Sequence, residues 1–493
     1  MTLMDLLASL PRADVDRPAA GREVLRVSHD SREVKPGDLF FAIRGGRSDG
    51  LDHVSEAVAR GAVAVVSDRP APDAGSGGAG VPWVTVERPR LALALAAARL
   101  AGDPAEKLVL AGVTGTNGKT TTTLLLSAIL GRHFGAAGFL GTIGYRTGRR
   151  EMEAPRTTPD ATVIQALLAE MVDQGLKAAA VEVSSHALAL DRVAGCRFDV
   201  AVFTNLTREH LDFHRDMEDY YSAKAMLFEM RKPGAIAVVN VDDPYGARLA
   251  AQVASPVLRV SSRGAPADVS ADAILCDLGG VSFDVVRPDV LAFRIESPLL
   301  GLFNVDNLLA AAAAGLALGF SEEEIADGCA RVRTVPGRLE RVEAGQPFPI
   351  VVDYAHTPDA LERLLLAVRE LTDLKIVLVF GAGGDRDRGK SFPMGEIAGR
   401  LADIPIVTSD NPRSEDPAAI LAEVGAGLAA SGATKALRIV DRREAIRAAI
   451  DLANSGTIVV IAGKGHETTQ VIGSQELPFD DRRVAAELAG ARR

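Results

Sequence analysis

Residues 109 to 121 read Val-Leu-Ala-Gly-Val-Thr-Gly-Thr-Asn-Gly-Lys-Thr-Thr, an apolar run that breaks into glycines, one lysine and hydroxyls. The next residues, 122–130, have the composition of a helix. Backbone N–H groups of a glycine turn at a helix N-terminus point toward an anion, and a lysine there can reach the outer phosphates of a nucleotide. The stretch therefore predicts a phosphate-binding loop in which Lys119 contacts phosphate and the Thr120 hydroxyl can hold Mg²⁺.

The predicted loop departs from the strict P-loop pattern. That pattern has a glycine five residues before the Gly-Lys pair, where this chain has Val113, so the loop is a variant built on Gly115 and Gly118. The alternative is an ordinary glycine-rich turn between a strand and a helix. We favour nucleotide binding because a strand is expected before the loop and a helix after it.

The composition is that of a folded, multidomain protein. The 493 residues correspond to roughly three domains, and 47% of them are hydrophobic. The net charge of −10 and the lack of a long basic run disfavour a nucleic-acid partner or an anionic membrane. Three widely spaced cysteines, Cys196, Cys276 and Cys329, suit a reducing compartment and exclude a thiolate zinc site.

We expect a cytoplasmic protein, without membrane insertion. The first residues lack a basic region, and Asp5 interrupts them early. The longest apolar run, 308–320, is too short and too rich in alanine to span a bilayer. We also expect a monomer.

The order of apolar runs and polar loops predicts an α/β protein of three domains, with boundaries at 1–103, 104–336 and 337–493. The first domain has short β-like runs, one clear helix at 54–60 and a Gly/Pro/Ser-rich segment, 69–80, with the composition of a disordered loop. The second has near-continuous apolar strands at 109–113, 178–183, 200–203 and 235–239, typical of a parallel sheet covered on both faces. Alternating strands at 257–296 and a helix at 307–318 follow.

The last domain repeats the scheme and is expected to be Rossmann-like. Apolar strands at 349–352, 375–380, 405–407 and 457–461 are each followed by a polar loop. Because the carboxyl ends of parallel strands line the ligand crevice, the polar loops of each sheet are expected to share a site.

Several of these loops carry residues whose chemistry is open to two readings. Glu182 ends a strand that is expected to be buried. Because a buried carboxylate near a phosphate loop needs a cation as a partner, we favour Glu182 as a Mg²⁺ ligand over a salt-bridged structural acid. His210 and His214 compete for a second role near that metal, and either can be a surface histidine. Thr158 or Asp160 can cap the helix expected at 161–171.

Arg413 and Glu467 are candidates for reading a zwitterionic amino-acid head. Arg413 follows Asn411-Pro412, so proline stiffens the loop that presents a guanidinium suited to a carboxylate. Glu467, on a glycine-flanked loop, can receive an ammonium group. From chemistry alone, the two side chains can equally well pair with each other.

Taken together, these residues resemble the Mur ligase family in six motifs that occur in order across nearly the whole chain. The motifs are 115–121 (Gly-Thr-Asn-Gly-Lys-Thr-Thr), 182–186 (Glu-Val-Ser-Ser-His), 205–212 (Asn-Leu-Thr-Arg-Glu-His-Leu-Asp), 303–307 (Phe-Asn-Val-Asp-Asn), 336–338 (Pro-Gly-Arg) and 353–356 (Asp-Tyr-Ala-His). Within the family, 410–413 (Asp-Asn-Pro-Arg) and 463–467 (Gly-Lys-Gly-His-Glu) match the members that add meso-diaminopimelate, since lysine-adding members usually lack the arginine.

The resemblance implies an enzyme that uses ATP and Mg²⁺ to join meso-diaminopimelate to a UDP-linked muramoyl dipeptide in peptidoglycan precursor synthesis. It implies an N-terminal UDP-binding domain, a central P-loop ATPase-like parallel sheet and a C-terminal Rossmann-like domain. The implied ATP-binding residues are Gly115, Thr116, Asn117, Gly118, Lys119, Thr120, Thr121, Asn304, Asn307, Arg338, Asp353 and His356. Those implied for the UDP-muramoyl dipeptide are Ser28, Ser31, Arg32, Thr157, Thr158, Ser184 and Arg192, and for diaminopimelate Arg386, Asp410, Asn411, Pro412, Arg413, Gly463 and Glu467. Taken alone, the turn that holds Ser28, Ser31 and Arg32 is more often capping chemistry than a ligand site.

The resemblance also implies catalytic roles for Lys119, His210 and Lys224 and a metal set of Thr120, Glu182, His210 and Lys224. Lys224 matches the lysine that these enzymes carbamylate, which requires a site that depresses the lysine pKa. Without the resemblance, Lys224 reads as an ordinary surface lysine of a helix. The sequence departs from some relatives at Leu190-Asp191, where they carry amides, and at Thr468-Thr469.

The expected reaction is ATP-driven amide formation through an acyl phosphate, with domain closure that excludes water. One alternative is a ligase of the same fold with another acceptor, either lysine or a folate-polyglutamate type of substrate. Another is a nucleotide-gated binding protein that hydrolyses ATP only to change shape.

Overall fold

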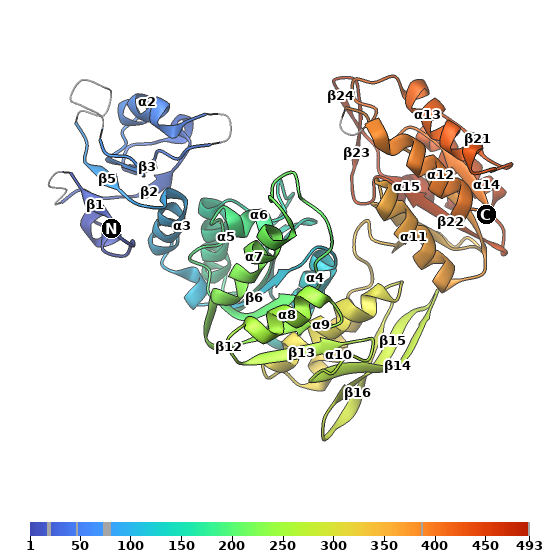
Figure 1. Ribbon diagram of the computed structural model, residues 1–493, viewed down its shortest axis with the longest axis horizontal. Helices are drawn as coiled ribbons and strands as arrows, with labels where there is room; N and C mark the ends of the chain where they lie inside the picture. Colours follow the sequence, from blue (N-terminus) through green and yellow to red (C-terminus); the bar gives the residue numbers. More distant parts are fainter. Residues whose placement is uncertain (17–20, 46–47, 72–79, 386–387, 492–493) are drawn as a thin grey trace. The chain divides into compact units, whose positions relative to one another are not determined.

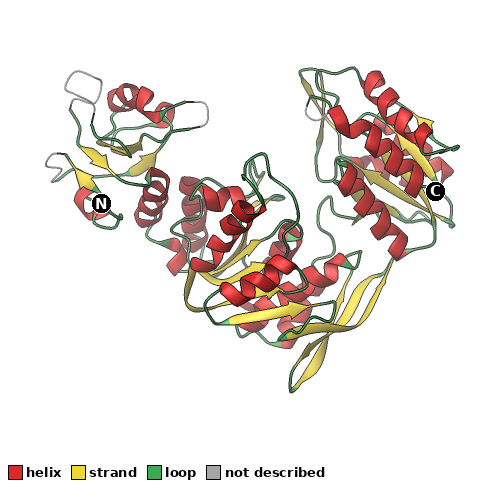
Figure 2. Cartoon of the chain, in the orientation of Figure 1, coloured by secondary structure: helices red, strands yellow, loops and turns green. Residues whose placement is uncertain are grey.

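The computed structural model describes residues 1–491 except 17–20, 46–47, 72–79 and 386–387. Most of the expected disordered loop at 69–80 therefore lies outside the described residues. The chain forms two compact units, the first made of residues 1–271, 285–293 and 306–329 and the second of residues 272–284, 294–305 and 330–493. Helices and strands alternate along the chain (Figures 1 and 2), and the predicted α/β class is confirmed.

The N-terminal region of the first unit is a small α/β layer. Its elements are α1 (Leu3–Leu7), β1 (Asp14–Val15), β2 (Arg26–Ser28), η1 (Ser31–Glu33), β3 (Asp38–Phe41), η2 (Gly50–His53), α2 (Val54–Ala59), β4 (Ala64–Ser67), β5 (Trp83–Thr85) and α3 (Pro89–Leu100). The sheet order in the described residues is β1-β5-β4-β3-β2, parallel except for β1. The helix expected at 54–60 is confirmed as α2, whereas α1 and α3 were not predicted. Helix α3 buries alanines on most sides and so lacks the amphipathic period that marks a surface helix.

The central region of the first unit is built on a parallel sheet. Its elements up to β13 are η3 (Pro104–Glu106), β6 (Val109–Thr114), α4 (Lys119–Phe134), β7 (Gly138–Gly141), β8 (Gly144–Arg146), β9 (Glu151–Met152), α5 (Ala161–Asp173), β10 (Ala178–Glu182), α6 (Ser185–Ala189), β11 (Phe198–Phe203), α7 (Met217–Glu229), β12 (Arg231–Asn240), α8 (Pro244–Gln252) and β13 (Val257–Ser261). The order across these strands is β13-β12-β11-β6-β10-β7-β8-β9. The strands from β13 to β7 are parallel, as predicted.

Strands β14 (Val269–Asp277), β15 (Gly280–Arg287) and β16 (Val290–Ser297) continue the sheet order beyond β13, and they contain residues of both units. The alternating strands expected at 257–296 are therefore confirmed. Helices α9 (Phe303–Ala317) and α10 (Glu322–Arg331) follow. Helix α9 begins four residues before the expected start at 307. No described helix is both long and apolar enough to cross a membrane.

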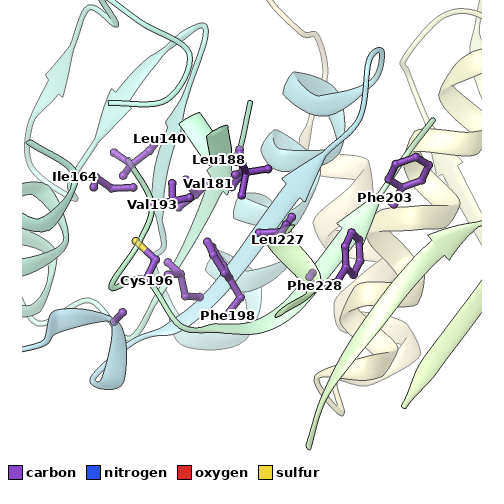
Figure 3. Close-up of a cluster of buried hydrophobic side chains, with 14 of the residues drawn as sticks. Leu140, Ile164, Val181, Leu188, Val193, Cys196, Phe198, Phe203, Leu227 and Phe228 are labelled. Carbon is purple, nitrogen blue, oxygen red and sulfur yellow. The ribbon is translucent and has the colours of Figure 1, made fainter. Parts of the chain in front are cut away.

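The central sheet places β6 between β10 and β11, with Glu182 opposite Val113 in the register. The core beneath it joins the strands to α5, α6 and α7, and Figure 3 shows Val181, Phe198 and Leu227 among its buried side chains. Because the strands are parallel and β6 is central, the loops after β6, β10 and β11 leave one edge of the sheet together. This edge carries the phosphate-binding loop.

The C-terminal part of the second unit is a second α/β sheet. Its elements are β17 (Glu340–Arg341), β18 (Ile350–Asp353), α11 (Pro358–Leu371), β19 (Lys375–Phe380), η4 (Arg388–Lys390), α12 (Ser391–Leu401), β20 (Ile404–Val407), α13 (Pro417–Ala430), β21 (Leu437–Arg438), α14 (Arg442–Leu452), β22 (Thr457–Ala462), β23 (Thr469–Ile472), β24 (Gln475–Pro478) and α15 (Asp481–Gly490). The order is β17-β18-β22-β19-β20-β21, parallel except for β17.

Strand β19 explains why this sheet is covered on both faces. Ile376, Leu378 and Phe380 pack in a core with α11, α12 and α13, while Val377 and Val379 pack in a second core with α14 and α15. Successive side chains of a strand point to opposite faces, so both sets must be apolar. The near-continuous apolar run that predicted the strand is a direct consequence.

Candidate functional site

The phosphate-binding loop connects β6 to the N-terminus of α4. Gly115 and Gly118 have φ values of +151° and +83°, which an L side chain rarely adopts. The Lys119 Nζ donates to the carbonyl oxygens of Gly115 (3.0 Å) and Thr116 (2.8 Å). A lysine folded back onto its own loop is well placed to move to an incoming phosphate.

The loop after β11 holds this turn in place. Thr116 N donates to Asn205 O (2.8 Å) and Asn117 N to Asn205 Oδ1 (2.9 Å). A Cβ on Gly115 would lie 1.9 Å from Thr204 Oγ1, so only glycine fits this approach.

Helix α9 also contacts the turn, through Asn307. Its Oδ1 accepts from Thr122 Oγ1 (3.4 Å) and would lie 2.2 Å from a Cβ on Gly118. The two glycines of the predicted variant loop are therefore both required by close contacts. Asn304 belongs to the second unit, where its Nδ2 donates to Leu300 O (2.8 Å).

Glu182 is fully buried directly beneath the loop. Its carboxylate accepts from Thr120 Oγ1 (3.1 Å), Thr142 N (2.9 Å) and Thr142 Oγ1 (3.1 Å). Burial raises the pKa of Glu182, while the charge of Lys119 opposes that rise. The contact between Thr120 and Glu182 brings together hydroxyl and carboxylate oxygens, which are ligands that Mg²⁺ prefers, so the donor set fits that ion.

Lys224 on α7 is also buried, and its Nζ donates to Gly115 O (2.6 Å) and lies 4.5 Å from the centre of the Tyr220 ring. Burial, helped by the charge of Lys119, lowers the pKa of Lys224 well below its ordinary value. The reading of Lys224 as a surface lysine is therefore wrong. The pattern of α7 contained the signal, because Lys224 lies four residues after Tyr220 and three before Leu227, on the buried face of the helix.

His210 and His214, the two histidines that competed for a metal role, lie in one aromatic cluster with His186. His214 is buried, with Nε2 2.9 Å from Ser185 Oγ and Nδ1 3.5 Å from Asp219. His210 is only partly buried, and the positive charges of Lys119 and Lys224 help burial to lower its pKa. His214 is thus enclosed by protein side chains, whereas His210 lies near Lys119 and Lys224.

No group of three or more His, Cys, Asp or Glu side chains in the described residues has the arrangement of a metal site. The set implied by the family resemblance, Thr120, Glu182, His210 and Lys224, is not such a group, because it includes a hydroxyl and a lysine that is expected to be carbamylated.

A second cluster adjoins Glu182. Thr157 Oγ1 lies 2.9 Å from Thr142 Oγ1, and Thr158 Oγ1 donates to Glu182 O (2.8 Å) and Ser184 Oγ (3.2 Å). Arg192 donates to Thr158 O (3.4 Å). Four of the candidate dipeptide-binding residues are therefore brought together beside the phosphate-binding loop.

The same contacts correct the capping prediction for α5. Asp160 occupies the N-cap position without a side-chain cap bond, and its carboxylate instead pairs with Arg156 (2.6 Å) and Arg192 (3.1 Å). Thr158 is occupied by the contacts to Glu182 and Ser184. Charged partners thus take the carboxylate that a helix would otherwise use.

The N-terminal candidates are held by local bonds. Ser28 Oγ donates to Asp30 O (3.0 Å), and Ser31 Oγ donates to Glu56 Oε2 (2.7 Å). The exposed Arg32 pairs with Asp30 (2.6 Å) and lowers the pKa of that carboxyl to about 2. These bonds agree with turn and capping chemistry and leave the Arg32 guanidinium at the surface.

In the second unit, Asp353 ends β18 and accepts from Leu339 N (2.8 Å) and Ala355 N (2.9 Å). Burial raises its pKa, against the charge of Arg338. The Arg338 guanidinium lies 5.8 Å from the Tyr354 ring centre, and His356 Nδ1 lies 2.8 Å from Tyr354 O. Arg338, Asp353 and His356 therefore lie close together around Tyr354.

The diaminopimelate candidates lie on the 410–413 loop and the 463–467 loop. Arg413, at φ +53°, donates to Gly384 O (2.7 Å), whereas Glu467 accepts from Asn411 Nδ2 (2.9 Å) and Lys464 Nζ (3.0 Å). Arg413 and Glu467 thus have separate partners, and the alternative in which they pair with each other is wrong. Pro412 accepts from Glu415 N through its carbonyl, and Asp410 and Gly463 lie against each other. Arg386 lies outside the described residues.

Sequence reasoning missed Thr142, Lys464, Arg442 and Asp481. The 463–467 motif predicts no role for Lys464, although glycines on both sides mark a loop where a side chain can turn inward. Arg442 and Asp481 start two helices with no pattern that predicts burial. Thr142 follows β7 and has no distinguishing neighbour in the sequence.

These features define a phosphate-binding α/β enzyme, because a glycine loop, a lysine and a buried carboxylate converge at one sheet edge. Three regions match Mur ligase domains: residues 23–100 the Mur ligase family catalytic domain, 113–315 the Mur ligase middle domain and 337–465 the Mur ligase glutamate ligase domain. The chain belongs to the Mur ligase family, as the sequence motifs predicted. It is an ATP-dependent ligase that forms amide bonds.

Similar proteins cover the chain almost completely. UDP-N-acetylmuramoyl-L-alanyl-D-glutamate–2,6-diaminopimelate ligase of Geobacillus thermodenitrificans is 45% identical over all of both chains, and that of Geobacter metallireducens is 47% identical over 93% of this chain and 92% of its own. A solved structure of a ligase with the same name is 34% identical and superposes with a TM-score of 0.74 over 97% of both chains.

Proposed function

We propose that the chain joins meso-diaminopimelate to UDP-N-acetylmuramoyl-L-alanyl-D-glutamate with the consumption of ATP. The names of the full-length relatives support this function. The observation that carries it in the structure is the separation of Arg413 from Glu467 on neighbouring loops. A guanidinium and a carboxylate that do not neutralise each other can receive the carboxylate and the ammonium of one amino-acid head.

In the proposed mechanism, the D-glutamyl carboxylate attacks the γ-phosphoryl group to give an acyl phosphate and ADP. The amine of diaminopimelate then attacks the acyl carbon, and phosphate leaves from the tetrahedral intermediate. Lys119 would exchange its bonds to the loop carbonyls for bonds to the transferring phosphoryl group. Arg413 would bind the distal carboxylate that lysine lacks, and Glu467 would bind an ammonium group.

Thr120, Glu182 and His210 would hold Mg²⁺, together with Lys224 if it is carbamylated. Mg²⁺ would neutralise charge that develops on the phosphoryl oxygens. The lowered pKa of Lys224 supports carbamylation, because only the neutral amine reacts with CO₂. A carbamate would replace a buried cation near Lys119 with a carboxylate.

We further propose the three domains 1–103, 104–336 and 337–493, a monomeric cytoplasmic enzyme, and UDP binding at Ser28, Ser31 and Arg32. The nucleotide would bind the 115–121 loop with Asn304, Asn307, Arg338, Asp353 and His356. The dipeptide would bind Thr157, Thr158, Ser184 and Arg192.

The test is the mass of the product formed when diaminopimelate and lysine compete for the UDP-dipeptide in the presence of ATP. A large excess of the diaminopimelate product over the lysine product supports the proposal, whereas equal incorporation of lysine would contradict the role of Arg413. Phosphate release should require both the UDP-dipeptide and diaminopimelate. Equal release without them would favour a nucleotide-driven switch.

A further inference from the structure

Two fully buried cations, Arg442 and Lys464, lie beneath the loops proposed to bind the acceptor amino acid. Arg442 is the first residue of α14 and forms two bonds with Asp481, the first residue of α15: Nε to Oδ1 (2.8 Å) and Nη2 to Oδ2 (2.7 Å). Its Nη2 also donates to Ala462 O (2.9 Å), at the end of β22. Arg442 therefore fixes the starting point of the 463–467 loop.

Lys464 connects this loop to the 410–413 loop. Its Nζ donates to Glu467 Oε2 (3.0 Å) and to Asn411 Oδ1 (3.2 Å), which also accepts from Val471 N (2.9 Å). With Oδ1 occupied by two donors, the amide of Asn411 can present only its Nδ2 to Glu467, where it donates to Oε2 (2.9 Å). Lys464 thus sets the orientation of both side chains.

The carboxylate of Asp410 lies in the same buried cluster. A Cβ on Gly463 would come within 2.4 Å of Asp410 Oδ2 and 3.8 Å of Arg442 Nη2, so Gly463 lies against both side chains. Among the described residues, Asp410 Oδ2 and Arg442 Nη1 are buried without a hydrogen-bond partner. The cluster is closely packed, but its charges are incompletely satisfied.

The cluster contains more carboxyl groups than cations. Asp410, Glu467 and Asp481 are three carboxyl groups, whereas Arg442 and Lys464 are two cations, and burial raises the pKa of Asp410 against the charges of these two cations. Charges in a buried site are costly unless they are balanced. Glu467, the most exposed of the three carboxylates, makes both of its side-chain hydrogen bonds through Oε2. Its other oxygen is the place where a further cation would balance the cluster.

We propose that Arg442 and Lys464 are positioning residues for the acceptor amino acid, and that they hold Asp410, Asn411 and Glu467 as a site with more carboxyl groups than cations, which selects an ammonium group. The proposal rests on the assignment of the acceptor to these two loops. Neither cation contacts the acceptor. Lys464 orients the side chains that do, and Arg442 holds the loop and Asp410 beneath them.

A purely structural role for these cations makes a different prediction. If the buried ion pairs served only stability, their removal would lower the melting temperature, and the KM values of a folded variant would stay unchanged. A positioning role changes the KM for diaminopimelate while those for ATP and the UDP-dipeptide stay constant. The two roles are thus distinguished by the substrate whose KM responds.

The experiment measures kcat, the three KM values and the melting temperature of the full chain with Lys464→Met, which keeps side-chain length and removes the charge, and with Arg442→Lys. We expect the KM for diaminopimelate to rise by about 10- to 100-fold in Lys464→Met, the range for loss of a charged hydrogen bond. KM for ATP and the UDP-dipeptide should stay within about twofold. If the Arg442→Lys variant does not fold, the KM for diaminopimelate of the Lys464→Met variant tests the proposal by itself.

Arg443→Ala is the matched control. Arg443 follows Arg442 on α14 and pairs with Glu487 on α15 (2.5 Å), so its loss removes a more exposed ion pair between the same two helices. We expect its kinetic constants to equal those of the parent. A folded Lys464→Met enzyme with an unchanged KM for diaminopimelate would overturn the proposal.

Glu467→Gln separates failure of the positioning proposal from failure of the acceptor assignment. If Glu467→Gln raises the KM for diaminopimelate and Lys464→Met does not, only the positioning role is wrong. If both variants leave this KM unchanged, the acceptor binds elsewhere and the assignment of the site is wrong.

Discussion

At the scale of single residues, Lys119 and Lys224 place two ammonium groups on one acceptor, the carbonyl oxygen of Gly115. Burial lowers the pKa of Lys224, and the like charge of Lys119 lowers it further. The residue with the lowered pKa is the one that can react as a neutral amine. Its conversion to a carbamate would turn a repulsion into an attraction.

We therefore predict that Lys224→Ala lowers kcat by about 100-fold or more, because charge stabilisation near the transferring phosphoryl group is lost. A short carboxylic acid such as acetate should restore part of the activity by filling the space of the carbamate. Lys232→Ala is the control, since Lys232 pairs with Asp199 (2.9 Å) at a partly exposed position. Activity of Lys224→Ala within threefold of the parent would contradict the role of Lys224.

The three cysteines provide a second residue-scale prediction. Burial raises the pKa of Cys196 and Cys329 to about 12, whereas Cys276 is only partly buried. Because the thiolate is the reactive form, a thiol reagent at pH 8 should modify Cys276 first and the other two only after unfolding. The measurement is the number of cysteine thiols that react with the reagent over time, with and without denaturant. A rapid phase that persists in Cys276→Ser would show that a buried cysteine is accessible.

The residues also show which properties of the site could be predicted from the sequence. The burial of Glu182 followed from its position at the end of an apolar strand, which requires no tertiary information. The separate partners of Arg413 and Glu467 could not be predicted, because they include Gly384 and Asn411, which approach these side chains only in the folded loops. Contacts between distant loops leave no periodic pattern in the chain.

At the scale of elements, the turn between β6 and α4 combines positive φ with close contact. Gly118 has a φ of +83°, and a Cβ there would meet Asn307 on α9 at 2.2 Å. Gly135, at the other end of α4, has a φ of +87° with nothing within 4 Å of a Cβ. Both positions have a positive φ, but only Gly118 has a close contact.

We predict that Gly118→Ala lowers the affinity for a non-hydrolysable ATP analogue by about tenfold or more, because the Cβ displaces Asn307 and the loop with it. Gly135→Ala should cost only the strain of positive φ, about 1–2 kcal/mol, and leave the affinity within twofold. Calorimetric titration and thermal unfolding measure the two effects. Equal affinities of the two variants would contradict a role for the contact with Asn307.

The elements also differ in how well the sequence predicted them. The parallel strands were predicted within a few residues, because both faces are buried and the runs are continuously apolar. The early start of α9 was missed because Phe303 to Asp306 mix polar and apolar residues without a clear period. Thr158 was a wrong choice of cap because it bonds to Glu182 and Ser184, which lie far along the chain.

At the scale of the whole molecule, the candidate nucleotide-binding residues are divided between two compact units. Asn307 and the phosphate-binding loop belong to the first unit, whereas Asn304, Arg338, Asp353 and His356 belong to the second. If all of them bind one nucleotide, the two units must meet around it. The acceptor loops belong entirely to the second unit, so their meeting would also bring the amine to the acyl phosphate.

We therefore predict that ATP analogue and UDP-dipeptide together make the molecule more compact. An acyl phosphate is hydrolysed if water reaches it, so the site must close before the first step. Small-angle scattering should give a smaller radius of gyration with both ligands than without them, and Gly118→Ala should reduce the change at subsaturating nucleotide. Superimposable profiles with and without saturating ligands would contradict closure and would require another means of protecting the intermediate.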